Sequence, residues 1–235
     1  DGEIILNAYR PLIQDLDSLP FQDYDYKTHY ILDAKDICQM DDTLLQKYTH
    51  GTYLTMPSRG CFYGCSYCCN NTLNKMYPHQ QIRKRSIDNI IKELAQIKIS
   101  GSYERIKFDD DNFFIYSIDE IREFCEKYKK NIGLPLTIYG ITPSMFTREK
   151  LSLLVDAGLI MVRLGIQTAS ERTKDIYKRR HSNQQVENAV KIINEFKAQI
   201  ARPFYDIILD NPWETDEDLI ETLMFLATLP SPYEL

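Results

Sequence analysis

Four of the six cysteines in the chain lie in one short segment, "RGCFYGCSYCCN" (59–70). Three of them, Cys61, Cys65 and Cys68, follow the pattern C-x3-C-x2-C. Thiolates at such short spacing can all face one centre, because closing the small loops between them costs little chain entropy. The spacing therefore predicts that this loop binds a metal centre or takes part in thiol chemistry.

Three kinds of site are compatible with these cysteines. A redox pair of Cys65 and Cys68 is possible, but it leaves Cys61 without a role. Structural zinc takes four ligands, and the fourth would have to be Cys69 or His79. An iron–sulfur cluster usually takes four cysteines, and three would leave one iron open for catalysis. The spacing favours the iron–sulfur interpretation, with zinc as the alternative.

Strand-like and helix-like patterns alternate from Gly51 onward, which predicts βα units around a parallel sheet. Helix starts carry N-cap residues, such as Ser86, Ser117 with Glu120 in capping-box spacing, and Thr215 or Asp216. The expected strands are 52–58, 104–108, 134–142, 159–168 and 204–210. The expected helices are 86–100, 117–130, 147–158, 182–200 and 215–229.

Each expected strand ends in polar or sulfur-rich residues: the cysteine loop, "DDDN", "TPS", "QTAS" and "DNPWET". Ligands of α/β proteins bind at the carboxyl ends of the strands. No glycine-rich phosphate loop follows the first strand. The five loops therefore predict one binding site at this edge of the sheet, and it does not use a glycine-rich phosphate loop.

Composition narrows the class of protein. A length of 235 residues with 43% hydrophobic content can bury one sizeable core. The net charge of −6 weighs against a nucleic-acid partner, and no apolar run is long enough to span a membrane. Six unevenly placed cysteines favour a reduced, cytoplasmic setting. Residues 1–51 show little regular period and are expected to be an extended lead-in, and the chain itself a piece of a longer protein.

With these features the chain resembles the radical S-adenosylmethionine (SAM) enzymes over nearly all of residues 52–235. "SRGCFYGCSYC" is similar to their cluster motif, "VRLGIQTASERT" to their fourth-strand element, and "YDIILDNPWETDEDLIETL" to their fifth-strand element. The resemblance implies an α/β fold, a partial (β/α) TIM-like barrel with about five βα units. The sixth unit is expected beyond Leu235, so this core is C-terminally incomplete. Residues 1–51 resemble the lead-in that follows a cobalamin-binding domain, which this chain does not contain.

The resemblance also implies a site. Cys61, Cys65 and Cys68 would hold a [4Fe-4S] cluster whose fourth iron is chelated by SAM. The implied SAM-binding residues are Tyr67, Asp110, Asp111, Arg163, Gln167, Arg179 and Ile208. Among these, Asp110 or Asp111 would pair with the methionine ammonium, and Arg179 would neutralise the SAM carboxylate.

The implied reaction is reductive cleavage of SAM to a 5'-deoxyadenosyl radical, in a cobalamin-dependent methyl transfer to an unactivated centre. A cyclase or rearrangement enzyme of the same branch is one alternative, and a zinc-stabilised binding domain without catalysis is another. The expected partners are a small-molecule or natural-product substrate and an electron donor such as flavodoxin or ferredoxin. Cobalamin is expected to bind mainly outside this chain, in the full-length protein.

Overall fold

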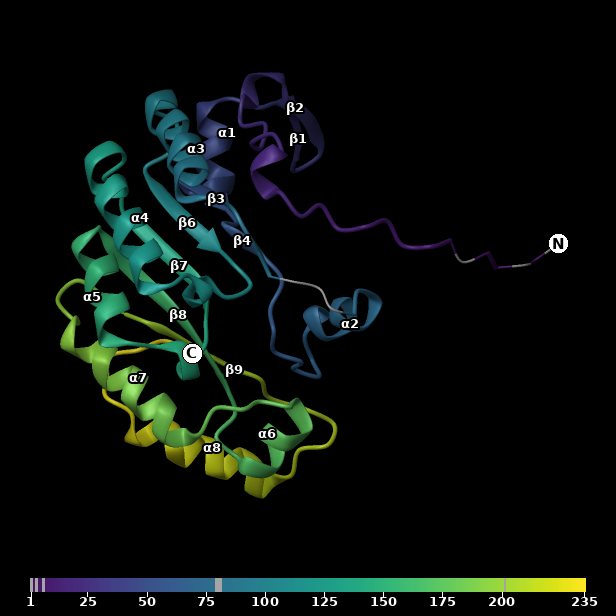
Figure 1. Ribbon diagram of the computed structural model, residues 1–235, viewed down its shortest axis with the longest axis vertical. Helices are drawn as coiled ribbons and strands as arrows, with labels where there is room; N and C mark the ends of the chain where they lie inside the picture. The colour runs from purple at the N-terminus through teal and green to yellow at the C-terminus, as the bar shows by residue number, and fades with distance from the viewer. Residues whose placement is uncertain (1, 3, 6, 79–81, 201) are drawn as a thin grey trace.

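The computed structural model describes residues 2, 4–5, 7–78, 82–200 and 202–235. Its central sheet has five strands in the order β3-β6-β7-β8-β9, and all neighbouring pairs are parallel (Figure 1). The strands are β3 (Thr52–Thr55), β6 (Arg105–Asp109), β7 (Leu136–Ile141), β8 (Leu159–Gln167) and β9 (Phe204–Ile207). Within this sheet each strand lies next to the one that follows it in chain order, as in a partial (β/α) barrel. The expected α/β fold is thereby confirmed.

Helices α3, α4, α5, α7 and α8 form an arc along one side of the sheet, with α6 next to α8, while α2 lies apart from this arc on the other side of the strands (Figure 1). The helices after β3 are α2 (Cys69–Met76), α3 (Ile87–Ser100), α4 (Ile118–Asn131), α5 (Arg148–Asp156), α6 (Glu171–Tyr177), α7 (Asn183–Glu195) and α8 (Asp216–Thr228). The predicted caps are confirmed: Ser86 caps α3, Ser117 and Glu120 form the capping box of α4, and Thr215 caps α8. Single 3₁₀ turns lie at Leu16–Ser18, Tyr26–Thr28, Phe113–Ile115 and Pro143–Met145.

Side-chain alternation along β8 separates the core from the site. Val162, Leu164 and Ile166 are fully buried in the hydrophobic core. Arg163 and Gln167 alternate with them and therefore point to the opposite, inner face of the sheet. Polar residues can occupy this inner face because the helices pack against the other one.

The expectation of an extended lead-in is wrong for residues 30–49. Strands β1 (Tyr30–Asp33) and β2 (Asp36–Gln39) form an antiparallel hairpin, and helix α1 (Asp42–Thr49) follows it. Each strand has only four residues, the shortest length over which alternation can indicate a strand.

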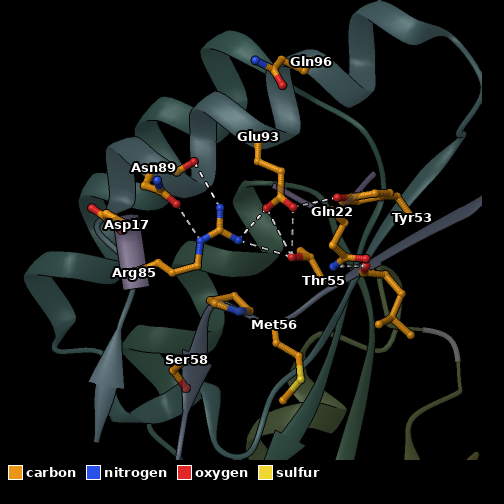
Figure 2. Close-up of polar contacts among 12 residues, drawn as sticks. Asp17, Gln22, Tyr53, Thr55, Met56, Ser58, Arg85, Asn89, Glu93 and Gln96 are labelled. Atoms are coloured by element: carbon orange, nitrogen blue, oxygen red, sulfur yellow. Dashed lines mark hydrogen bonds and ion pairs between the residues drawn. The ribbon is translucent and has the colours of Figure 1, made fainter. Parts of the chain in front are cut away.

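A buried ion pair holds the carboxyl end of β3, just before the cysteine loop (Figure 2). Arg85 donates to Glu93 at 2.6 Å, and the Glu93 side chain is only 1% exposed. The Tyr53 hydroxyl donates to the same carboxylate at 2.7 Å, and Thr55 donates to it as well. The short strands β4 (Ser58–Arg59) and β5 (Arg83–Lys84) then pair antiparallel and close the base of the segment that carries the cysteines.

Candidate functional site

A cavity of about 240 Å³ lies where the cysteine loop meets the carboxyl ends of the strands. Cys61, Cys65 and Cys68 all line it. So do most of the residues predicted to bind SAM: Tyr67, Asp110, Asp111, Arg163, Gln167 and Arg179. Ile208 is the one predicted residue outside it. The structure therefore brings together side chains from four separate parts of the sequence at the predicted edge of the sheet.

The three motif cysteines are less exposed to solvent than the adjacent Cys69. Cys65 is buried, Cys61 and Cys68 are partly buried, and Cys69 is exposed at the first residue of α2. Burial raises the pKa of the Cys61 thiol to about 11 and raises the pKa of Cys68 above its ordinary value. Both are thiols at neutral pH, so a centre that binds thiolates must displace their protons.

The arrangement differs from that of a single-ion site. Within the described part of the chain, no three His, Cys, Asp or Glu side chains converge closely enough to hold one metal ion. Structural zinc needs four such ligands. Of the two candidates for a fourth ligand, Cys69 is exposed, and His79 lies outside the described residues. A cubane cluster is held by thiolates at separate corners and does not need this convergence.

Asp111 holds the cysteine loop by two hydrogen bonds. One carboxylate oxygen accepts the Gly60 backbone N–H at 2.8 Å, and the other accepts Asn70 Nδ2 at 2.8 Å. Asn70 Nδ2 also donates to Cys68 Sγ at 3.8 Å. Because both oxygens of Asp111 already have partners on the loop, this carboxylate positions the cysteines.

Asp110 is placed differently. Its Oδ1 accepts the Ser58 backbone N–H at 3.1 Å and the Ser58 hydroxyl at 2.7 Å. Its Oδ2 is buried and has no hydrogen-bond partner among the described residues. Burial raises the pKa of Asp110 to about 6, against the hydrogen bonds from Ser58, which lower it. Of these two carboxylates, Asp110 is the one with an oxygen free to meet a ligand.

Further polar atoms in the cavity wall are also buried without a partner in the described part of the protein. They are Thr142 Oγ1, Gln167 Oε1 and Arg179 Nε. Buried polar atoms are normally paired, so these acceptors and this donor are available to water or to a polar ligand in the cavity. Gln167 also has a left-handed φ of 67° at a register shift between β8 and β9, a strained conformation of the kind that functional sites retain. The residues therefore fit a cofactor that carries both an ammonium and a carboxylate group.

Ile208 lies in a second, more apolar cavity of about 650 Å³. Tyr67 lines both cavities and connects them. The Ile208 backbone N–H donates to the Gln167 carbonyl at 2.9 Å, so the two cavities also meet at the ends of β8 and β9. Trp213 is 67% exposed and lines this second cavity.

Sequence reasoning missed several residues that line the cavity. Gly140 has a φ of +72°, and a Cβ there would lie 1.8 Å from the Asp110 carbonyl oxygen. A glycine inside a strand is a signal of such close approach. Thr142 lies in the predicted "TPS" loop but was not singled out. Asn70 and Asp206 gave no signal in the sequence, and Asp206 pairs with Arg163 at 2.6 Å.

The family model described as "Radical SAM superfamily" matches residues 55–226. The chain belongs to the radical SAM superfamily. This superfamily of enzymes uses a [4Fe-4S] cluster with SAM, as the resemblance implied. No helix among the described residues is long and apolar enough to cross a membrane.

Curated relatives include two named methyltransferases. The chain is 24% identical over 233 residues to an uncharacterized methyltransferase of Pyrococcus horikoshii, covering 99% of this chain and 46% of the relative. It is 26% identical over 124 residues to cytidylyl-2-hydroxyethylphosphonate methyltransferase of Streptomyces wedmorensis, covering 52% of this chain and 22% of the relative. The chain thus spans less than half the length of either relative.

Solved structures confirm the radical SAM barrel fold. The radical SAM methyltransferase TsrM of Kitasatospora setae, solved with tryptophan and a SAM analogue, has a TM-score of 0.66 at 19% identity, over 84% of this chain and 38% of its own. The cobalamin-dependent radical SAM enzyme OxsB has a TM-score of 0.60 at 20% identity, over 78% of this chain and 27% of its own.

Proposed function

We propose that residues 52–235 form the radical SAM core of a cobalamin-dependent methyltransferase that acts on a small-molecule substrate. One observation carries this proposal. The three motif cysteines line the same cavity as Asp110, Gln167 and Arg179, each of which has a buried polar atom without a partner in the described structure. The methyltransferase names of the relatives support the reaction type.

In this proposal Cys61, Cys65 and Cys68 hold a [4Fe-4S] cluster with one iron open. The cluster and SAM together would supply an electron and a 5'-deoxyadenosyl radical, while the protein supplies binding, orientation and exclusion of side reactions. Asn70 and Asp111 keep the loop in place before the cluster is loaded. The protein is thereby preorganised for its cofactor.

The free atoms of the wall suggest how SAM is oriented. Asp110 Oδ2 would accept the methionine ammonium, and Arg179 Nε would donate to the carboxylate. Gln167 Oε1 is neutral and would accept a further hydrogen bond from the ammonium or the ribose. Ile208 would pack on the adenine in the second cavity, next to Tyr67.

Arg163 would face the substrate side of this site. Its guanidinium is held by Asp206 at 2.6 Å and lies 5.1 Å from the Tyr139 ring centroid. This pair lies on the inner face of the sheet, and Arg163 and Asp206 both line the cavity. The side chain is therefore positioned to contact a ligand in this cavity.

The remaining partners belong to the proposal as well. Residues 1–51 would follow a cobalamin-binding domain, and cobalamin would bind mainly to that domain. The electron would come from a flavodoxin- or ferredoxin-like donor in the cytoplasm. A cyclase or rearrangement enzyme of the same branch would use the same core, so product analysis with the full-length protein separates these outcomes.

The first test is anaerobic reconstitution of the chain with iron and sulfide. We expect a brown protein whose reduced cluster gives an EPR signal that changes on addition of SAM. The Cys61→Ala, Cys65→Ala and Cys68→Ala variants should each lose the cluster, while Cys69→Ala, the adjacent control, should keep it. A colourless protein with stoichiometric zinc would refute the proposed function.

A further inference from the structure

The guanidinium of Arg179 lies between the cysteine loop and β8. Its Nη1 donates to Cys65 Sγ at 3.6 Å, and its Nη2 donates to the Gly165 carbonyl oxygen. Both contacts come from the same planar group, so the sulfur and the strand are held at a set distance from one another. These contacts use one N–H of each Nη atom, and Nε has no partner among the described residues.

The chain around α6 explains how Arg179 reaches this sulfur. Helix α6 ends at Tyr177, and its C-cap residue Lys178 is left-handed with a φ of 55°. The chain therefore turns back toward the cavity at the next residue. The same end of the helix also binds the loop: the Ser66 backbone N–H donates to the Tyr177 carbonyl at 3.0 Å, and the Ser66 hydroxyl donates to the Ile176 carbonyl at 2.7 Å.

A cation that donates to a ligand sulfur changes the energetics of the centre. Each electron added to an iron–sulfur cluster increases its negative charge, and hydrogen bonds to the sulfurs and nearby positive charge stabilise the reduced form. Cys65 is buried, so solvent screens this interaction less than at the surface. Arginine keeps its charge at any physiological pH.

We propose that Arg179 is a positioning residue that raises the reduction potential of the cluster through its N–H···S contact with Cys65. This inference rests on the proposed function, since it requires the cluster on the three cysteines. It gives Arg179 a second role besides the SAM carboxylate. If Arg179 acted only on the SAM carboxylate, its substitution would lower SAM affinity and leave the reduction potential of the SAM-free cluster unchanged.

The test is an EPR-monitored redox titration of the reconstituted chain without SAM. We expect Arg179→Gln to have a more negative midpoint potential than the wild type. The control is Arg180→Gln, which removes the same charge from the next residue, an exposed one, and should leave the potential unchanged. Iron and sulfide content and circular dichroism are measured first for every variant.

The outcomes separate the two proposals. If the wild type binds no iron–sulfur cluster, the proposed function fails. If Arg179→Gln binds a full cluster at the wild-type potential, or if Arg180→Gln shifts the potential equally, the role of Arg179 is refuted. If Arg179→Gln does not bind the cluster, the potential of Arg179→Lys is measured instead. The shorter lysine side chain breaks the contact with the Cys65 sulfur while its positive charge remains nearby. A wild-type potential in that variant would overturn the inference, and a more negative one would support it.

Discussion

Gly140 offers the sharpest test of how the site is built. A Cβ at this position would lie 1.8 Å from the carbonyl oxygen of Asp110, 2.8 Å from its carbonyl carbon and 3.2 Å from the carbonyl carbon of Asp111. These atoms all belong to the backbone, so no side chain can swing away to make room. Replacing Gly140 by alanine must therefore displace the loop that carries both carboxylates.

Two effects set the size of the loss in Gly140→Ala. A residue with a Cβ in the left-handed region costs about 1–2 kcal/mol, and Gly140 has a φ of +72°. Overpacking against atoms that cannot rotate away costs about 1–3 kcal/mol more. We therefore expect the free energy of unfolding to fall by about 2–5 kcal/mol, a large part of the stability of a typical domain.

Gly133→Ala is the matched control. Gly133 has a φ of +68°, but the nearest atom to a Cβ there, the Lys129 carbonyl oxygen, is 3.8 Å away. The free energy of unfolding of this variant should fall only by the cost of a left-handed residue with a Cβ, about 1–2 kcal/mol. Urea unfolding followed by circular dichroism measures both variants, and the reconstituted Gly140→Ala protein should also bind SAM more weakly. Equal losses of stability, with equal SAM affinities, would refute the close approach of β7 to the Asp110 loop.

Three further predictions concern single side chains. Arg85→Met leaves the Glu93 carboxylate buried without its cation and should lower the free energy of unfolding in urea by about 3–5 kcal/mol. The double variant Arg85→Met/Glu93→Leu should recover most of this loss. Equal losses in the single and double variants would contradict the ion-pair argument. Because the pKa of Asp110 is about 6, it gains its proton as the pH falls, and SAM affinity of the reconstituted chain should drop about tenfold from pH 7 to pH 5. Asp110→Asn should remove this pH dependence, and a dependence that persists would point to another group. Asp210 has a φ of 58°, so Asp210→Gly should raise the unfolding free energy by about 0.5–1 kcal/mol; a loss would show that its side chain stabilises the loop.

Much of the fold could be predicted because it depends on neighbours in the chain. The capping box of Ser117 and Glu120 spans three residues, and its hydrogen bonds form within one turn of α4. The strands of the sheet follow from apolar runs separated by helices with one buried face. The hairpin of residues 30–39 escaped prediction because its strands are short, and Leu32 and Ile37 are exposed.

The candidate site likewise has features that the sequence predicts and features that it does not. The spacing of Cys61, Cys65 and Cys68 is a property of the sequence, and so is the order of polar loops that follow the strands. The different partners of Asp110 and Asp111 could not be predicted. Adjacent residues of the same type separate here because one packs against Ser58 and the other against Gly60 and Asn70.

The sequence by itself determined the cysteine motif and the alternation of strands and helices, because these depend on spacing over a few residues, and the resemblance of its motifs implied the superfamily. Only the tertiary structure decided which polar atoms remain free, that Gly140 meets the Asp110 backbone, and that Ile208 lies in a second cavity. It alone places Arg179 on Cys65, 114 residues away in the chain. Such contacts depend on how the strands and α6 pack around the inner face, and no local pattern in the sequence records that packing.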